Sequence, residues 1–145
     1  MKKQLLFCAL AGVMMACQQE SDIQPNSVTL ASEVVGTYRT NLYLDPSYVA
    51  TSAEQMPVTE LRAESDSAVT LVYTKQYSPR ASRLIEHILL SRHPTGIELR
   101  SAGSVIGTLE TDRIFTDNGM EKQGKLLRLN VQKNTQNSLT FVGAK

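Results

Sequence analysis

The feature that most constrains this chain is a series of short segments in which apolar and polar residues alternate. In the segment 68–75, for example, Val69, Leu71 and Tyr73 share one face, and other residues stand between them. Because successive side chains of a β-strand point to opposite faces, this alternation predicts strands with one buried face. Such segments recur at roughly ten-residue spacing with turn-forming residues between them, which is typical of an all-β sandwich or barrel.

About eight or nine antiparallel strands are expected from this pattern. They cover residues 34–44, 57–63, 68–75, 82–91, 97–100, 105–109, 113–116, 125–132 and 138–144. No helical segments alternate with these strands, which excludes a parallel α/β sheet. We therefore predict an all-β fold, an up-and-down meander of about eight strands that closes into a small barrel. Closure removes exposed strand edges, and the interior either fills with side chains or holds one small ligand.

Turn-forming residues mark the ends of several expected strands. In the first strand, Tyr38, Leu42 and Leu44 share one face and Asn41 lies on the other, until Asp45-Pro46-Ser47 interrupts the pattern. Later in the chain, Asp117-Asn118-Gly119 is a strong hairpin signal, because Asn and Gly tolerate positive φ.

The segment 82–91 fits two patterns. Its large apolar residues are spaced as on one face of a helix: Leu84, Ile85, Ile88 and Leu89. Ser78-Pro79 is a suitable start for that helix, with proline at its first position. The same residues also fit a strand. We favour the strand, because strands are expected on both sides and residues 93–96 are typical of a hairpin loop.

The N-terminus carries the pattern of an export signal. The basic start Met1-Lys2-Lys3 precedes an apolar run at residues 5–13. This run is too short to span a bilayer, which takes about 20 apolar residues, and it is typical of a secretory signal. The following Met14-Met15-Ala16-Cys17 is similar to the lipobox of bacterial lipoproteins. That resemblance implies cleavage before Cys17 and acylation of this cysteine, whereas the alternative is a plain secretory signal.

The predicted organisation has three parts: a lipoprotein signal peptide at 1–16, a lipidated cysteine with a flexible tether at 17–33, and a barrel domain at 34–145. Cys8 falls in the removed part, so Cys17 would be the one cysteine left and the domain would hold no disulfide. Several acyl chains on one residue anchor a protein stably. The resemblance implies a lipid-anchored protein of the bacterial cell envelope, on the periplasmic or surface face of the outer membrane.

The charge balance argues against polyanionic partners. The full sequence has 15 basic and 14 acidic residues, and 13 basic against 14 acidic remain when Lys2 and Lys3 are removed. Without a basic stripe to follow phosphates, we expect no nucleic-acid binding. A polybasic membrane patch is not expected either.

Short motifs in the barrel segment resemble those of lipocalins. Gly36-Thr37-Tyr38 resembles the motif that opens the first lipocalin strand, and residues 139–145 resemble the last strand of small bacterial lipocalin-like lipoproteins. The resemblance covers residues 34–145. It implies a lipocalin-like barrel that offers a small apolar ligand its mouth or interior. In lipocalins a late arginine packs over the first-strand aromatic residue, so the resemblance also implies a contact between Arg128 and Tyr38.

We find no catalytic motif in the sequence. Gly-x-Ser-x-Gly, His-Glu-x-x-His, a phosphate-binding glycine loop and paired cysteines are all missing. Glu86 and His87 form the one acid–base pair available, and we favour the alternative that His87 is a half-exposed strand residue. We therefore predict a protein that is not an enzyme, with no catalytic residues, no metal site and no cofactor.

The candidate ligand-binding residues are Tyr38, Tyr73 and Arg128. Tyrosines at strand ends can stack on sugars or flat ligands, and the sequence offers five: Tyr38, Tyr43, Tyr48, Tyr73 and Tyr77. The alternative is that Tyr38 and Tyr73 belong to the core. Most arginines alternate with acidic residues and are expected to form ordinary cross-strand ion pairs.

The predicted function is a non-catalytic binding or interaction module. Its expected partners are the membrane, through the lipid anchor on Cys17, and a small apolar ligand or an envelope protein. The alternatives are an inhibitor of an envelope enzyme, acting through an exposed loop such as 43–56 or 77–80, and a structural component of a surface complex.

Overall fold

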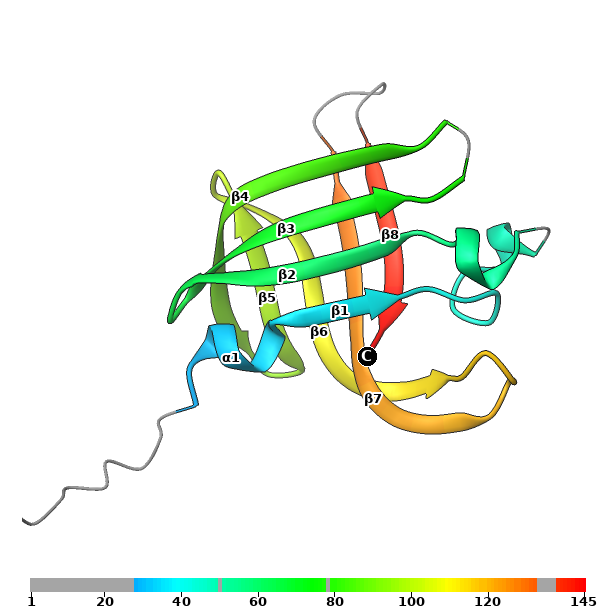
Figure 1. Ribbon diagram of the computed structural model, residues 1–145. Helices are drawn as coiled ribbons and strands as arrows, with labels where there is room; N and C mark the ends of the chain where they lie inside the picture. The colour runs from blue at the N-terminus through cyan, green and yellow to red at the C-terminus, as the bar shows by residue number, and fades with distance from the viewer. Residues whose placement is uncertain (1–27, 50, 78, 133–137) are drawn as a thin grey trace, which may run out of the picture.

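The computed structural model describes residues 28–49, 51–77, 79–132 and 138–145. In these residues, eight antiparallel strands follow one another around a closed barrel (Figure 1). The elements are α1 (Leu30–Val34), β1 (Gly36–Arg39), η1 (Pro46–Tyr48), η2 (Ala53–Gln55), β2 (Val58–Ser65), β3 (Ala68–Lys75), β4 (Ala81–His93), β5 (Gly96–Ser101), β6 (Ser104–Phe115), β7 (Glu121–Val131) and β8 (Leu139–Ala144). The predicted all-β meander is confirmed. The ring closes where Arg39 of β1 pairs with Ala144 of β8.

The predicted signal peptide 1–16, Cys17 and most of the predicted tether lie outside the described residues. In the part of the chain that is described, no helix is long and apolar enough to cross a membrane.

The end of the predicted tether forms the short helix α1, which covers one end of the barrel. The Thr29 side chain caps the helix by accepting a hydrogen bond from the backbone N–H of Ser32. Ala31 and Val34 are buried against the barrel, and the Ala31 N–H donates to the Asp66 carbonyl at 3.0 Å. A helix this short shows no sustained period, which is why the sequence did not reveal it.

The first strand is shorter than predicted, because Asn41 turns the chain. Its side-chain oxygen accepts hydrogen bonds from the backbone N–H groups of Tyr43 and Leu44, each at 3.0 Å. Its amide group donates to the Phe115 carbonyl at 2.7 Å. This local turn competes with the strand ladder, so β1 ends at Arg39. Asn41, expected on the outer face, is buried.

The ambiguous segment 82–91 is a strand, and a β-bulge explains its helix-like spacing. The β3–β4 register shifts between the pairs Leu71–Ile85 and Val69–Ile88, so β4 carries an extra residue. His87 adopts a φ of +56° at this point. Ile88 is buried and Ile85 packs against the core, although they are three residues apart. The bulge thus gives a strand the spacing of a helical face.

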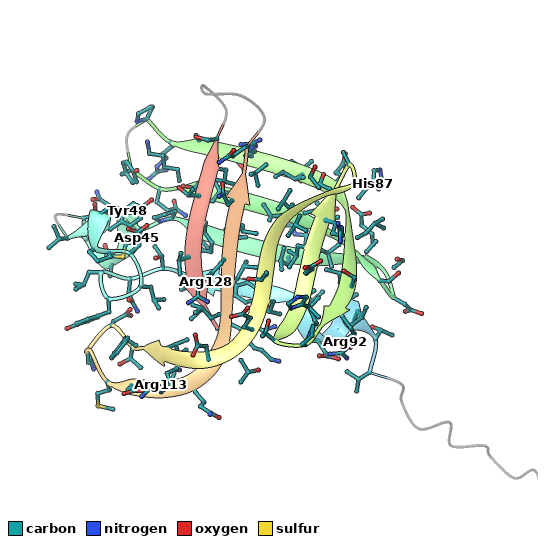
Figure 2. All side chains as sticks on the ribbon, turned by 180° about the vertical axis from the view of Figure 1, so that it is seen from behind. Asp45, Tyr48, His87, Arg92, Arg113 and Arg128 are labelled. Atoms are coloured by element: carbon teal, nitrogen blue, oxygen red, sulfur yellow. The ribbon has the colours of Figure 1, made fainter. Side chains whose placement is uncertain are left out.

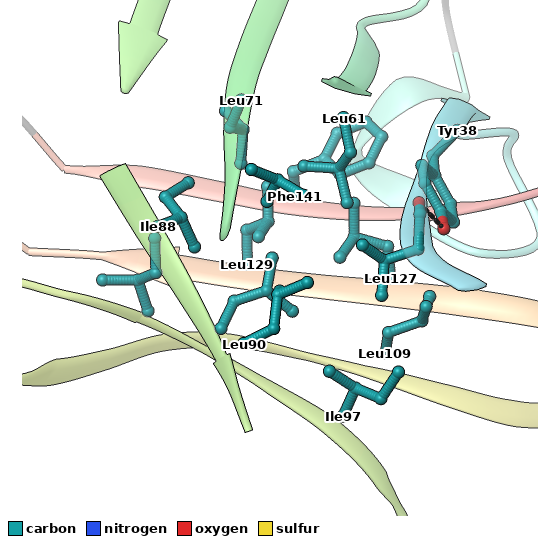
Figure 3. Close-up of a cluster of buried hydrophobic side chains, with 14 of the residues drawn as sticks. Tyr38, Leu61, Leu71, Ile88, Leu90, Ile97, Leu109, Leu127, Leu129 and Phe141 are labelled. Carbon is teal, nitrogen blue, oxygen red and sulfur yellow. Dashed lines mark hydrogen bonds between the residues drawn. The ribbon is translucent and has the colours of Figure 1, made fainter. Parts of the chain in front are cut away.

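The centre of the barrel is packed with apolar side chains (Figure 3). Those with least exposure come from most of the strands: Tyr38, Leu61, Val69, Leu71, Ile88, Leu99 and Leu127. The separately predicted strands 105–109 and 113–116 form one continuous strand, β6, which supplies Ile106, Leu109 and Ile114. Because this core fills the middle of the barrel, the candidate binding surfaces lie at the barrel ends and on its outer face.

Candidate ligand-binding site

Three tyrosines meet at the end of the barrel opposite α1, and we call Tyr48, Tyr73 and Tyr77 the tyrosine cluster. Tyr73 lies on β3, Tyr77 follows that strand, and Tyr48 closes the turn η1. The rings of Tyr48 and Tyr77 pack edge to face, with centroids 6.2 Å apart and an interplanar angle of 65°. The Tyr48 hydroxyl also interacts with the hydroxyls of Tyr73 and Tyr77. The cluster therefore presents aromatic faces and hydroxyls together.

The hydroxyls of Tyr48 and Tyr73 have raised pKa values. Burial raises the pKa of Tyr48 above its ordinary value, and the neighbouring Tyr73, Tyr77 and Asp45 raise it further through charge repulsion. Burial also raises the pKa of Tyr73, with Tyr77 adding to the effect. Both residues thus remain neutral hydrogen-bond donors at physiological pH.

A lysine adds positive charge to the cluster. The Lys75 ammonium lies 4.1 Å from the centroid of the Tyr77 ring, within the range of a cation–π contact. Lys75 stands two residues after Tyr73 on β3, so both side chains leave the same face of the strand. An anionic group on a ligand would meet this ammonium beside the aromatic rings.

Two buried threonine hydroxyls near the cluster lack a hydrogen-bond partner among the described residues, those of Thr40 and Thr59. Thr59 pairs with Tyr38 on one side and with Tyr73 on the other. Buried polar groups are nearly always paired, and leaving one unpaired costs about 1–3 kcal/mol. Thr59 thus offers a hydrogen-bonding group beside Tyr73, inside the wall of the barrel.

The structure places two of the three candidate ligand-binding residues in the interior. Tyr38 is fully buried, and its hydroxyl donates to the Val34 carbonyl at 2.6 Å. Tyr73 is half-buried, with its ring edge-on to Phe141 at a centroid distance of 6.0 Å. Arg128 lies outside, where its guanidinium contacts Glu110 at 3.4 Å and Asp112 at 3.7 Å (Figure 2). Ligand binding by these three residues stays a prediction.

The expected packing of Arg128 over Tyr38 is wrong. Arg128 stands between the buried Leu127 and Leu129, so the alternation of β7 points it away from the interior. The cation near the Tyr38 ring is Lys145, whose ammonium lies 5.2 Å from the ring centroid and donates to the Val35 carbonyl.

The histidine that sequence placed in an acid–base pair has a different partner. His87 contacts Glu64 of β2, with its Nδ1 and its backbone N–H each 3.0 Å from a carboxylate oxygen. The Thr70 hydroxyl also donates to Glu64. The hydrogen bonds from Thr70 and His87 lower the pKa of Glu64. The imidazole is 86% exposed, so this group holds the bulge together at the surface and does not enclose a reaction site.

Several arginines form ion pairs with carboxylates at the surface. On the outer wall, four arginines each contact a carboxylate: Arg62–Glu60, Arg92–Glu33, Arg100–Glu98 and Arg113–Glu121. Within the described residues, no group of three or more His, Cys, Asp and Glu side chains is placed to hold a metal ion.

Comparisons with protein-family models, curated proteins and solved structures found no match for this chain. The closed eight-stranded barrel is consistent with the lipocalin-like fold, and membership of that family stays a proposal.

Sequence analysis missed part of the candidate site. Tyr48 and Tyr77 were considered among five tyrosines, but nothing in the sequence showed that they meet Tyr73. Thr59 and Lys75 were not considered. The period of β3 places Lys75 on the face of Tyr73, so this one residue was detectable from the sequence.

Proposed function

We propose that this protein is a lipid-anchored lipoprotein of the bacterial cell envelope that acts as a non-catalytic binding module. In this proposal the tyrosine cluster binds a small ligand with a flat apolar or sugar face. Support for the anchor comes from the resemblance of residues 14–17 to a lipobox. Support for a binding role comes from the closed barrel with an aromatic cluster at one end.

The tyrosine cluster at the end of the barrel is the observation that carries the proposal. Aromatic rings stack on flat apolar groups and on the apolar faces of sugars, and hydroxyls fix the ligand's orientation. Lys75 suits a ligand with an anionic substituent.

The packed centre sets the size of the ligand. Leu61, Leu71 and Leu127 fill the middle of the barrel and are almost inaccessible. A ligand at the cluster is therefore expected to lie at the barrel mouth, not along its axis. This geometry favours a single ring system over a long acyl chain.

A fluorescent probe tests the binding role. The full chain is titrated with 1-anilinonaphthalene-8-sulfonate, a flat aromatic sulfonate whose emission rises in apolar surroundings. We expect saturable binding to the wild-type chain and a loss of at least tenfold in affinity in the Tyr48→Ala/Tyr77→Ala variant. Leu84→Ala/Leu89→Ala is the matched control, because both are exposed apolar residues of β4 outside the cluster.

Circular dichroism must show that each variant keeps its strand content, since this probe also binds partly unfolded chains. Equal binding to the wild-type chain and the double variant would contradict the proposed ligand site. The alternatives would then be an inhibitor of an envelope enzyme or a structural component of a surface complex, each of which uses a protein partner.

The anchor has a separate test. Cells that express the wild-type chain or Cys17→Ser are labelled with a fatty-acid analogue and fractionated. We expect label in the wild-type chain, recovery of that chain with the outer membrane, and loss of label in the variant. Unlabelled wild-type protein would contradict the lipoprotein assignment and leave the barrel and its cluster unaffected.

A further inference from the structure

Four cations belong to neighbouring strands where the barrel closes, and we call Arg39, Lys122, Lys125 and Lys145 the basic face. They come from β1, from β7 and from the residue that follows β8. Among the described residues, no carboxylate lies within ion-pair distance of any of them, whereas the arginines of the outer wall are paired. Sequence analysis expected no polybasic patch. Arg39 is far in the chain from the three lysines, and barrel closure brings its strand beside theirs.

Three of these cations line a surface pocket of about 260 Å³, namely Arg39, Lys122 and Lys145. Its other lining residues are Asn41, Ile114, Phe115, Thr116, Asp117 and Ala144. Asp117 is the one carboxylate side chain in this lining, so the pocket has an excess of positive charge. A pocket with this charge suits a phosphate or carboxylate group.

Lys145 lies beside a second cation, Lys125. Its pKa is lowered, first by burial and then by repulsion from Lys125. The Lys145 and Lys125 backbones are joined by two hydrogen bonds, at 3.0 Å and 3.3 Å, which hold the two residues side by side. The Lys145 ammonium already donates to the Val35 carbonyl, so Arg39 and Lys122 are the pocket cations left to bind an anion.

Exposed apolar side chains border the basic face at the tip of the β6–β7 hairpin. Phe115 and Met120 belong to this hairpin, and Leu42 and Tyr43 come from the loop after β1. We call these four residues the apolar tip. The rings of Tyr43 and Phe115 lie 6.1 Å apart, and Asn41 bonds the loop to Phe115, so the two segments form one surface. The Met120 side chain is 67% exposed.

We propose that the basic face and the apolar tip together dock on a bilayer that contains anionic phospholipids. Lipid phosphates bind the cations of the pocket, and the tip side chains enter the interfacial layer, where tyrosine and other amphipathic groups are favoured. Charge complementarity selects this occupant, because an excess of cations beside apolar side chains matches an anionic headgroup above acyl chains. The inference rests on the proposed function, in which the anchor at Cys17 holds the chain at a membrane.

The expected contribution of each cation follows from the attraction of basic residues to anionic membranes. Removing one cation weakens binding about fivefold, and removing two weakens it about thirtyfold. The attraction falls with added salt, because it acts within a screening length of about 10 Å at 0.1 M.

The test uses the full chain with Cys17→Ser, which prevents acylation, and Met120→Trp as the reporter. The sequence contains no tryptophan, so emission comes from the tip alone. A reporter at this position responds to the tip and not to the apolar segment 5–13. The chain is titrated with vesicles of phosphatidylethanolamine and phosphatidylglycerol, and with vesicles of phosphatidylcholine.

We expect a blue shift with phosphatidylglycerol, a much smaller one with phosphatidylcholine, and weaker binding at high salt. In the same background, Arg39→Gln/Lys122→Gln should need about thirtyfold more lipid for half of the shift. Arg62→Gln/Arg100→Gln is the matched control, because it removes the same charge from ion-paired positions on the wall. We expect this control to bind almost as the parent does.

Three results would overturn the docking proposal: no shift with either vesicle, equal shifts with both lipids, or equal weakening by the two double variants. A further arm adds inorganic phosphate without lipid. If calorimetry shows that phosphate binds the pocket while vesicles leave the emission unchanged, the basic face serves a free anion and not a membrane. Failure of the proposed function can be distinguished from failure of the docking proposal. Acylation is measured by fatty-acid labelling, and ligand binding at the tyrosine cluster is measured with the sulfonate probe.

Discussion

Replacing Tyr38 by phenylalanine tests how the barrel holds the helix α1. The carbonyl of Val34 lies in the last turn of α1, where helix carbonyls lack partners within the helix. The Tyr38 hydroxyl donates to this carbonyl at 2.6 Å in a fully buried position. The variant removes the donor and keeps the ring, so the core packing is unchanged and the carbonyl loses its partner.

The expected cost is that of an unpaired buried acceptor, about 1–3 kcal/mol in the free energy of unfolding. For a domain of about this size, each kcal/mol lowers the unfolding midpoint by roughly 3–6 °C. We expect the midpoint of Tyr38→Phe to fall by about 3–18 °C at pH 7. Tyr43→Phe is the control, because Tyr43 is exposed and such changes stay within about 0.5 kcal/mol.

The stability of the chain at alkaline pH is a second test of the role of Tyr38. Burial raises the pKa of Tyr38 in the folded chain, whereas the unfolded chain ionises near pH 10. Its contribution to stability is therefore present below pH 10 and is lost as the pH rises above that value. At pH 11 the free energy of unfolding of the wild-type chain should be lower by about 1.4 kcal/mol than at pH 7 because of Tyr38. Tyr38→Phe lacks this loss, so the wild-type chain and the variant should differ less in free energy of unfolding.

Urea unfolding followed by circular dichroism at pH 7 and pH 11 measures both effects. The reasoning is refuted if Tyr38→Phe and Tyr43→Phe unfold alike at pH 7. It is also refuted if the difference in free energy of unfolding between wild type and Tyr38→Phe is larger at pH 11 than at pH 7. Burial of a neutral hydroxyl requires this difference to become smaller.

Three further predictions concern the bulge, a close strand contact and the core. At the bulge, His87→Gly should be more stable than His87→Ala by about 1 kcal/mol in urea unfolding, because φ is positive there. Gly107→Ala should cost about 1–3 kcal/mol, since its Cβ would lie 2.4 Å from a carbonyl oxygen of β7. Leu127→Ala should cost about 2–5 kcal/mol, whereas the exposed Leu84→Ala should change stability by less than about 0.5 kcal/mol; equal midpoints would contradict the assigned core.

The strand pattern was readable wherever alternation was uninterrupted. β3 and the buried positions of β7 follow the period of two that the sequence shows, and the hairpin at Asn118-Gly119 forms where its turn chemistry indicated. The alternation of β7 also indicates that Arg128 points outward, so its expected contact with Tyr38 conflicted with a signal already in the sequence. The resemblance to lipocalins, applied residue by residue, was misleading at this position.

Local interruptions were not readable in the same way. The bulge at His87 changes the spacing of inward residues from two to three, which makes a strand resemble a helix. Asn41 ends β1 through a side-chain turn that the apolar pattern of the following leucines conceals. In both cases a few hydrogen bonds outweigh the periodic signal of the segment.

The sequence by itself determined the all-β class, the order of the strands and the faces they bury, because these depend on the period of neighbouring residues. It also carries the lipobox-like motif at Cys17, on which the proposed anchor depends. Only the tertiary structure brought Tyr48 and Tyr77 to Tyr73, placed Glu64 beside His87, and set the cations of β1, β7 and the residue after β8 on neighbouring strands. These groupings join residues far apart in the chain, and barrel closure and strand register, not local periodicity, decide which of them meet.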